Sequence, residues 1–193
     1  MSSKDNREFE TKVLDFDCAE IIDRLRTLGA FEKPEYLARR YVFGYHNRFP
    51  EFIRLRDEGD RITLAYKKKD HTSSNLGNTI EIQTIVEDFD KTAEILQTLT
   101  FESVMYFETR HHIFNYQGVE YSIDIWPLMK PILEIEAGSE EKVQEGLKLL
   151  GLEEKAVGDL DMMHITKEYG FDVNDFSYFG FDKQEKFSVP PST

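Results

Sequence analysis

The chain of 193 residues has one cysteine, one tryptophan and no apolar run as long as a membrane span. The single thiol, Cys18, excludes an internal disulfide and is typical of a reducing compartment. The sequence also opens without the basic and then apolar segment of a secretory signal. We therefore expect a cytoplasmic protein that has no membrane partner.

Basic residues are scarce. The 24 Lys and Arg are outnumbered by 37 Asp and Glu, which gives a net charge of −13. This charge argues against nucleic acid as a partner. The chain also lacks the Gly-rich phosphate loop of the Walker type. Its five histidines, including the pair His111-His112, lack zinc-ligand spacing, and we assign them surface or packing roles.

Hydrophobic residues make up 40% of the chain, enough to bury a core, and three helices are predicted around it. The first begins at Asp17, which forms a capping box with Glu20, and it stops at Gly29. The second spans Lys91–Leu99, and the third runs from about Ser139 to Leu150. The residues expected to face inward are Ile21, Ile22, Leu25 and Leu28 in the first helix, Ile95, Leu96 and Leu99 in the second, and Val143, Leu147 and Leu150 in the third.

Most of the remaining chain reads as strands joined by hairpins. After an opening strand at Glu8–Lys12, the predicted strands are Leu37–Tyr45, Glu51–Arg56, Arg61–Lys69, Thr79–Val86, Tyr106–Tyr116, Val119–Ile125 and Ile132–Ala137. This order predicts an antiparallel α+β fold with about eight strands and three helices.

Charged residues are sorted between these strands. Side chains alternate between faces, so each charged set shares one face of its strand. The acidic sets are Glu8 and Glu10 with Lys12, then Asp124, and then Glu134 and Glu136; the basic sets are Arg54 and Arg56, Lys67 and Lys69, and Arg110. An ordinary sheet with one solvated face is the alternative, but such faces usually mix their charges. We predict an eight-stranded barrel with a polar, charged lumen and helices packed outside.

Such a lumen suits one kind of ligand. Carboxylates are hard oxygen donors that match Mg²⁺ or Mn²⁺, and magnesium is usually shared between carboxylates and substrate phosphates. Arginine and lysine bind phosphate oxygens, arginine with two parallel hydrogen bonds. The pattern therefore predicts a small-molecule ligand that carries a chain of phosphates.

Together these motifs resemble the CYTH superfamily of triphosphate tunnel metalloenzymes. The signature Glu-x-Glu-x-Lys matches Glu8, Glu10 and Lys12, and the later motifs follow in the family order over residues 6 to 170. The resemblance implies an eight-stranded tunnel that binds a triphosphate through Mg²⁺ or Mn²⁺. It implies metal ligation by Glu8, Glu10, Asp124, Glu134 and Glu136, and substrate binding by Arg54, Arg56, Lys67, Lys69, Arg110 and Glu81. Lys12 would orient the terminal phosphate or the attacking water, so that Lys12, Glu8 and Glu10 form the catalytic set.

The resemblance leaves the reaction open, because the sequence departs from the family pattern. Gln83 stands where a second glutamate is usual, and Glu108 where a lysine often precedes the arginine. We expect a metal-dependent triphosphatase acting on tripolyphosphate, thiamine triphosphate or a nucleoside triphosphate. The alternative is a class IV adenylyl cyclase, whose members often carry His-Phe where this chain has Ser2 and Ser3. A non-catalytic protein that binds polyphosphate or nucleotide is the third reading.

For domain organisation we predict one tunnel domain over residues 1–170 and an aromatic tail over residues 171–193. The tail is expected to pack back on the domain, with a frayed end. An exposed sheet edge or this tail could support a homodimer.

Overall fold

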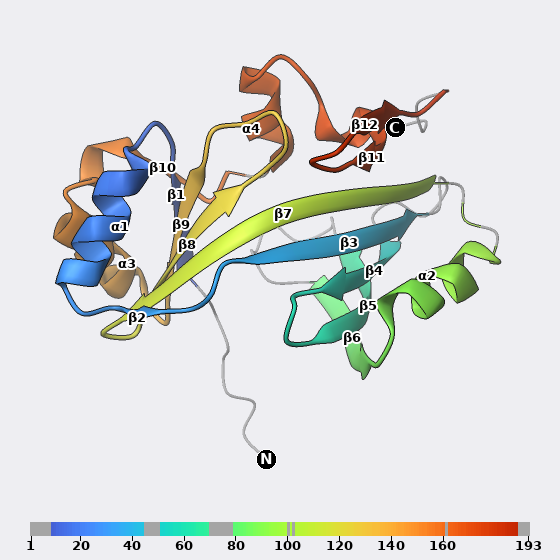
Figure 1. Cartoon of the computed structure of the whole chain (residues 1–193), viewed down its shortest axis with the longest axis horizontal. Coiled ribbons are helices and arrows are strands. Elements are labelled where there is room, and N and C mark those ends of the chain that lie inside the picture. Colours follow the sequence, from blue (N-terminus) through green and yellow to red (C-terminus); the bar gives the residue numbers. More distant parts are fainter. Residues whose placement is uncertain are drawn as a thin grey trace. The chain divides into compact units, whose positions relative to one another are not determined.

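A computed structural model describes residues 9–44, 51–69, 79–99, 101, 103–160 and 162–188. The chain divides into two compact units. The first contains residues 1–36 and 110–169, and the second contains residues 37–109 and 170–193. One long strand, β7 (Ser103–Tyr116), runs through both units (Figure 1).

The first unit is an antiparallel sheet with two long helices. Its strands follow the order β10-β1-β9-β8-β7, and the short strand β2 also pairs with β7. The elements besides β7 are β1 (Phe9–Val13), α1 (Cys18–Thr27), β2 (Phe31–Glu32), β8 (Val119–Ile125), β9 (Ile132–Ala137), α3 (Glu140–Leu150), the 3-10 turn Glu153–Lys155, β10 (Ala156–Gly158) and α4 (Met162–Glu168).

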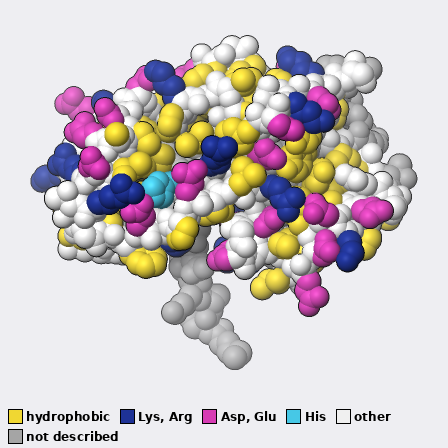
Figure 2. All heavy atoms as spheres, in the orientation of Figure 1, with side chains coloured by type: hydrophobic (Ala, Val, Ile, Leu, Met, Phe, Trp, Pro, Cys, Tyr) yellow, Lys and Arg dark blue, Asp and Glu magenta, His cyan; other side chains and the backbone are white. Residues whose placement is uncertain are grey.

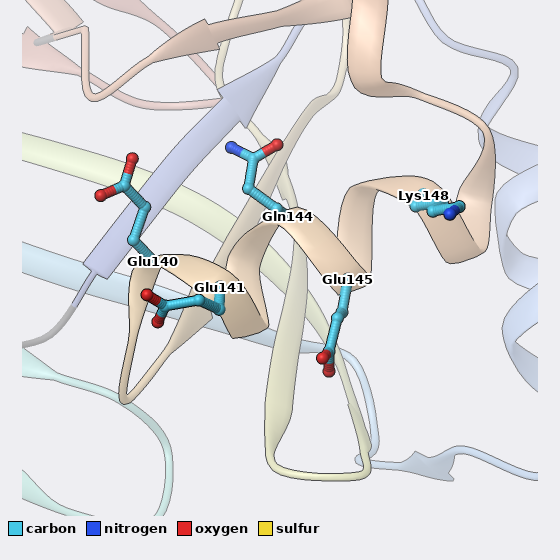
Figure 3. Close-up of a pocket in the computed structure, with 5 residues that line it drawn as sticks. All are labelled: Glu140, Glu141, Gln144, Glu145 and Lys148. Carbon is cyan, nitrogen blue, oxygen red and sulfur yellow. The ribbon is translucent and has the colours of Figure 1, made fainter.

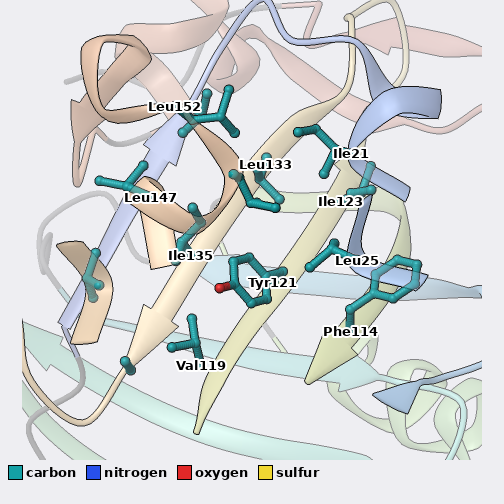
Figure 4. Close-up of a cluster of buried hydrophobic side chains, with 14 residues drawn as sticks. Ile21, Leu25, Phe114, Val119, Tyr121, Ile123, Leu133, Ile135, Leu147 and Leu152 are labelled. Carbon is teal, nitrogen blue, oxygen red and sulfur yellow. The ribbon is translucent and has the colours of Figure 1, made fainter. Parts of the chain in front are cut away.

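Helices α1 and α3 cover one face of this sheet with their apolar stripes (Figure 4). The Asp17 carboxylate caps α1 by accepting hydrogen bonds from the backbone N–H groups of Ala19 and Glu20. Ser139 caps α3, and Gly151, with φ of 65°, ends it. Both helices are confirmed where the sequence predicted them. The buried cluster contains Ile21 and Leu25 of α1, Phe114 of β7, Val119, Tyr121 and Ile123 of β8, Leu133 and Ile135 of β9, and Val143 and Leu147 of α3.

The second unit is built in the same way from one sheet and one helix. Its strands follow the order β7-β3-β4-β5-β6, and β11 joins β7 in parallel. The elements are β3 (Tyr36–Gly44), β4 (Glu51–Asp57), β5 (Ile62–Lys69), β6 (Thr79–Val86), α2 (Phe89–Gln97), the 3-10 turn Val173–Asp175, β11 (Phe176–Phe179) and β12 (Gln184–Lys186).

Helix α2 differs from its prediction. It begins at Phe89 after the cap residue Asp88, two residues earlier than expected, so its buried stripe is Phe89, Ala93 and Leu96. Spacing of four and three residues keeps these side chains on one helix face. Ile95 is 64% exposed and the nearby Leu99 is 53% exposed, so the prediction that they face inward is wrong.

The C-terminal segment adds a hairpin to the second unit. Strand β11 pairs with β7 at Tyr178↔Tyr106, and the two tyrosine rings stack with centroids 4.6 Å apart. The backbone N–H of Phe181 donates to Glu108 Oε2 over 3.0 Å. The predicted boundary near residue 170 stays a prediction.

The α+β class and the antiparallel sheet are confirmed. The sheet, however, has twelve strands, and within the described residues its main path runs from β10 to β6 without closing. The predicted count of eight omitted the short strands β2, β10, β11 and β12, which carry too few residues for a visible alternation. In the described part of the chain, no helix combines the length and the apolar character that a membrane crossing needs.

Candidate functional site

Lys12 occupies the centre of an acidic group in the first unit. Its Nζ lies 2.8 Å from Glu10 Oε1, 3.2 Å from Glu134 Oε2 and 3.1 Å from Asp159 Oδ1. The register of β1 against β9 pairs Lys12 with Glu134 and Glu10 with Glu136, so these four side chains project from one face. Lys12 is only 8% exposed, and its buried ammonium is compensated by the surrounding carboxylates.

Three of these acids form a group that could hold a metal ion. One carboxylate oxygen from each of Glu10, Glu134 and Glu136 lies within 4.8 Å of the others. Hard carboxylate oxygens suit Mg²⁺ and Mn²⁺ alike. The residues present therefore fit a divalent cation without selecting one metal.

The proximity of these charges changes their protonation. Burial raises the pKa of Glu10 to about 7, Asp159 and Glu134 act in the same direction, and Lys12 opposes them. Burial also raises the pKa of Glu134 against the effect of Lys12. Burial lowers the pKa of Lys12, but the neighbouring carboxylates outweigh it and raise that pKa overall. The acidic group is therefore short of positive charge near neutral pH.

Asp124 lies on the same face of the first unit. Ser122, two residues before it, pairs with Glu134 across β8 and β9. Asp124 Oδ1 lies 2.7 Å from Nδ1 of His111 and accepts a hydrogen bond from the Ser122 hydroxyl. The His111 ring stacks on Tyr36 with centroids 5.4 Å apart. Among the described acids, Asp124 is outside the three-glutamate group, and the sequence interpretation missed its histidine partner.

Arg110 lies on the other face of the sheet. Strand β7 pairs with β8 so that His111 lies opposite Asp124 and Arg110 lies opposite Ile125. Directly opposed residues project to the same side of a sheet, and neighbours along a strand project to opposite sides. Arg110 is thus separated from the acidic face, whereas the sequence interpretation placed it among the phosphate ligands.

Three other predicted basic ligands share one face of the second unit. Arg54 and Arg56 alternate with Leu55 along β4, and Lys67 pairs with Phe52, which projects to the same side as the arginines. Leu55 is fully buried on the other face, in the cluster that packs against α2. The alternation that the sequence predicted for β4 and β5 is therefore confirmed.

One further cation lies on this basic face. Arg40 of β3 pairs with Arg56, and its guanidinium carbon lies 5.5 Å from the ring centroid of Phe107. Arg56 also contacts Glu58 through Nη2, while its Nε is buried and has no hydrogen-bond partner within the described ranges. A buried donor of this kind suits an anionic ligand. No sequence motif pointed to Arg40.

Three of the predicted site residues cannot be placed in this way. Glu8 lies outside the described residues. Lys69 and Glu81 lie in β5 and β6, but their side chains are not part of what the structure describes.

A separate surface hollow lies along α3 (Figure 3). It is lined by Glu140, Glu141, Gln144, Glu145 and Lys148, all of them exposed. Acidic and basic side chains are also interspersed over the face drawn in Figure 2. Neither feature gathers buried, convergent groups as the surroundings of Lys12 do, so neither is a candidate site.

Comparison with known proteins decides the family. The model of the CYTH domain matches residues 6–160, which includes the acidic group around Lys12 and the basic face of β4 and β5. The chain belongs to the CYTH domain family. A relative from Methanocaldococcus jannaschii, named "Putative adenylate cyclase MJ0240", is 28% identical over 167 residues, which cover 83% of this chain and 91% of the relative.

Solved structures share the CYTH fold with this chain. A conserved hypothetical protein from Pyrococcus furiosus superposes with a TM-score of 0.60 at 21% identity, over 80% of this chain and 97% of that one. HpAC1 from Hippeastrum, described as having a dominant triphosphatase activity, superposes with a TM-score of 0.53 at 13% identity, over 84% of this chain and 95% of that one. At these identities the likeness concerns the fold alone.

Proposed function

We propose that this CYTH protein is a metal-dependent hydrolase of triphosphates, acting on tripolyphosphate, thiamine triphosphate or a nucleoside triphosphate. The observation that carries the proposal is the buried Lys12 ammonium beside the three-glutamate group. The fold prediction that belongs with it, a closed eight-stranded tunnel with a charged lumen, remains part of the proposal.

Glu10, Glu134 and Glu136 would hold the divalent cation, and Asp124 and Glu8 are the further candidates from the family motif. A bound Mg²⁺ or Mn²⁺ would neutralise phosphate charge and polarise the phosphoryl group. Lys12 would orient the terminal phosphate or the attacking water from its buried position. In the hydrolysis, the water oxygen forms a bond to the terminal phosphorus and its proton passes to solvent, while the bridging P–O bond breaks, so that orthophosphate and the diphosphate leave.

The phosphate ligands in this proposal are those that the family motif implies. Arg54, Arg56 and Lys67 would bind the non-bridging oxygens, with Lys69 as the further candidate. Phosphoryl transfer needs little covalent chemistry from the protein, so charge neutralisation and positioning contribute most of the rate. Metal binding by acids and phosphate binding by basic residues agree with the way these charges are sorted between the strands. Arg110 is left out because it lies on the opposite face from Asp124.

Adenylyl cyclase activity is the second candidate. It is favoured by the name of the Methanocaldococcus jannaschii relative. In that reaction the ribose 3′-hydroxyl loses its proton to solvent and attacks the α-phosphorus, the bond from the α-phosphorus to the bridging oxygen breaks, and pyrophosphate leaves. The same cation and basic residues would serve, and the two reactions differ in which phosphorus is attacked.

The test is one incubation series of the full chain with Mg²⁺ or Mn²⁺ and tripolyphosphate, thiamine triphosphate or ATP. Release of orthophosphate supports the hydrolase, and release of pyrophosphate with cyclic AMP supports the cyclase. Substrate binding without any turnover would reject both and leave a binding protein.

The matched variant is Glu10→Gln, which keeps the side-chain shape but removes a charged ligand. We expect metal-dependent turnover to fall at least about a hundred-fold, because a ligand charge is lost at the reacting phosphate. Glu145→Gln, on the exposed side of α3, is the control and should leave turnover unchanged. Equal rates for Glu10→Gln and wild type would locate the active site elsewhere.

A further inference from the structure

Asp159 is brought to the acidic group by the short strand β10. Strand β10 pairs with β1 so that Gly158 lies opposite Lys12. Gly158 has φ of 74°, a backbone conformation that glycine adopts without strain. The chain turns there, and the next residue places its carboxylate 3.1 Å from the Lys12 ammonium. This contact joins residues 147 positions apart and belongs to no motif in the sequence.

The three carboxylates around Lys12 differ in kind. Glu10 and Glu134 belong to the group that could hold a metal ion, but Asp159 does not. Its side chain is 62% exposed, against 31% for Glu10 and 26% for Glu134. Asp159 is thus the carboxylate at Lys12 that lies outside the glutamate group, although it also interacts with Glu10.

A divalent cation and the Lys12 ammonium need the same two glutamates. Like charges at such short range repel, so a cation that binds Glu10 and Glu134 weakens their hold on Lys12. Lys12 is 8% exposed, and its ammonium cannot be left unpaired at low cost. Its remaining carboxylate partner is then Asp159.

We propose that Asp159 is a positioning residue that retains the Lys12 ammonium when a divalent cation occupies the glutamate group. The inference rests on the proposed metal site and adds a residue to it. It also gives Lys12 a defined location in the loaded protein, beside the cation and not among its ligands.

The proposal predicts how Asp159 affects metal affinity. Without metal, Lys12 has three carboxylate partners, so Asp159→Asn removes one of three. With metal, the same substitution removes the partner on which Lys12 depends. Loss of an interaction that is stronger in the bound state weakens binding. For a pair whose acid is well exposed, we expect Mn²⁺ to bind about three-fold more weakly.

The test is a double-mutant cycle that uses Mn²⁺ alone, measured by isothermal titration calorimetry on the full chain without substrate. Asp159→Asn is compared with wild type, and the same change is compared in a Lys12→Met background. Asp159 acts through the ammonium, so its effect should be present in the first pair and absent in the second. Asp159→Glu, which restores the charge, should recover most of the wild-type affinity.

The controls separate this role from simpler ones. Asp15→Asn breaks another aspartate–lysine pair of the first unit, between Asp15 and Lys130 at 2.6 Å, and should leave Mn²⁺ affinity unchanged. Equal loss of affinity from Asp159→Asn in both backgrounds would show that Asp159 acts on the cation or on Glu10 and not through the ammonium, and would overturn the proposal. An unchanged affinity in the wild-type background would overturn it too. Lys12→Gln replaces Lys12→Met if thermal unfolding shows that the methionine variant does not fold.

These outcomes are independent of turnover. If wild type binds Mn²⁺ and the cycle shows the coupling, the inference holds even when no triphosphate is hydrolysed. If wild type binds no Mn²⁺, the metal site of the proposed function fails, and the role of Asp159 fails with it.

Discussion

His111 of β7 contacts Asp124 of β8, with His111 Nδ1 lying 2.7 Å from Asp124 Oδ1. The same pairing fixes the two faces of β7, because it places His111 with the acidic residues and Arg110 on the opposite side. The two neighbouring residues therefore have different predicted effects on activity.

We expect His111→Ala to lower triphosphate turnover about ten-fold, because the variant lacks the hydrogen bond that fixes the Asp124 carboxylate. Arg110→Ala should change turnover by less than about two-fold, as is usual for an exposed residue outside the site. Steady-state kinetics of both variants make the comparison. A larger loss for Arg110→Ala would restore the role that the family motif assigned to it.

The segment around His111 shows why sequence alone could not fix this site. One alternating set in β7 reads Tyr106, Glu108, Arg110, and the other Phe107, Thr109, His111. Neither set is clearly apolar, so binary pattern does not tell which faces the ligand. The register of β7 against β8 determines which of the two sets lies on the acidic face. By contrast, Arg54 and Arg56 flank the buried Leu55, and this pattern predicts their face without a structure.

The Asp159 contact was missed, and the buried face of helix α2 was predicted incorrectly, for related reasons. The contact from Asp159 to Lys12 depends on a three-residue strand and a glycine turn far along the chain. For α2, the sequence prediction began the helix at Lys91 and turned Ile95 and Leu99 inward together with Leu96. The cap at Asp88 begins the helix at Phe89 instead, and the buried stripe is Phe89, Ala93 and Leu96. The sequence shows that a helix or strand exists, but which of its faces is buried depends on tertiary contacts.

Because one face of α2 is buried and the other is exposed, two adjacent residues of this helix should differ in their effect on stability. Leu96 is 8% exposed and Ile95 is 64% exposed. Leu96→Ala should lower the free energy of unfolding by about 2–4 kcal/mol, because it leaves a cavity under the helix. Ile95→Ala should change it by less than about 0.5 kcal/mol. Urea unfolding followed by circular dichroism measures both, and losses of similar size for the two variants would show that Ile95 and Leu96 both face inward, as the sequence predicted.

The raised pKa of Glu10 predicts how stability depends on pH without divalent cations. In the unfolded chain this carboxyl has its ordinary value of 4.5, and in the folded protein burial raises its pKa to about 7. Between these values the folded state binds more protons, so the free energy of unfolding falls as pH rises. The contribution of Glu10 is fully present below pH 4.5 and is lost as pH passes about 7.

Thermal unfolding in EDTA from pH 5 to pH 8 tests this against Glu10→Gln, which cannot ionise. The melting temperature of wild type should fall more steeply with pH than that of the variant. Mn²⁺ added at pH 8 should stabilise wild type more than the variant, because a bound cation replaces the missing proton. Parallel pH profiles for the two proteins would contradict the raised pKa.

The two faces of β3 carry adjacent arginines with different expected roles. Arg40 pairs with Arg56 on the basic face, whereas the adjacent Arg39 contacts Asp57 over 2.8 Å and Asp90 on the other face. If the basic face binds phosphate, Arg40→Ala should raise KM for tripolyphosphate about ten-fold and leave kcat nearly unchanged, since uniform binding energy is lost. Arg39→Ala should leave KM unchanged, because its ion pairs hold α2 and β4 and do not involve the ligand. A KM effect from Arg39→Ala equal to that of Arg40→Ala would mean that the substitutions act through overall charge and not through a phosphate-binding face.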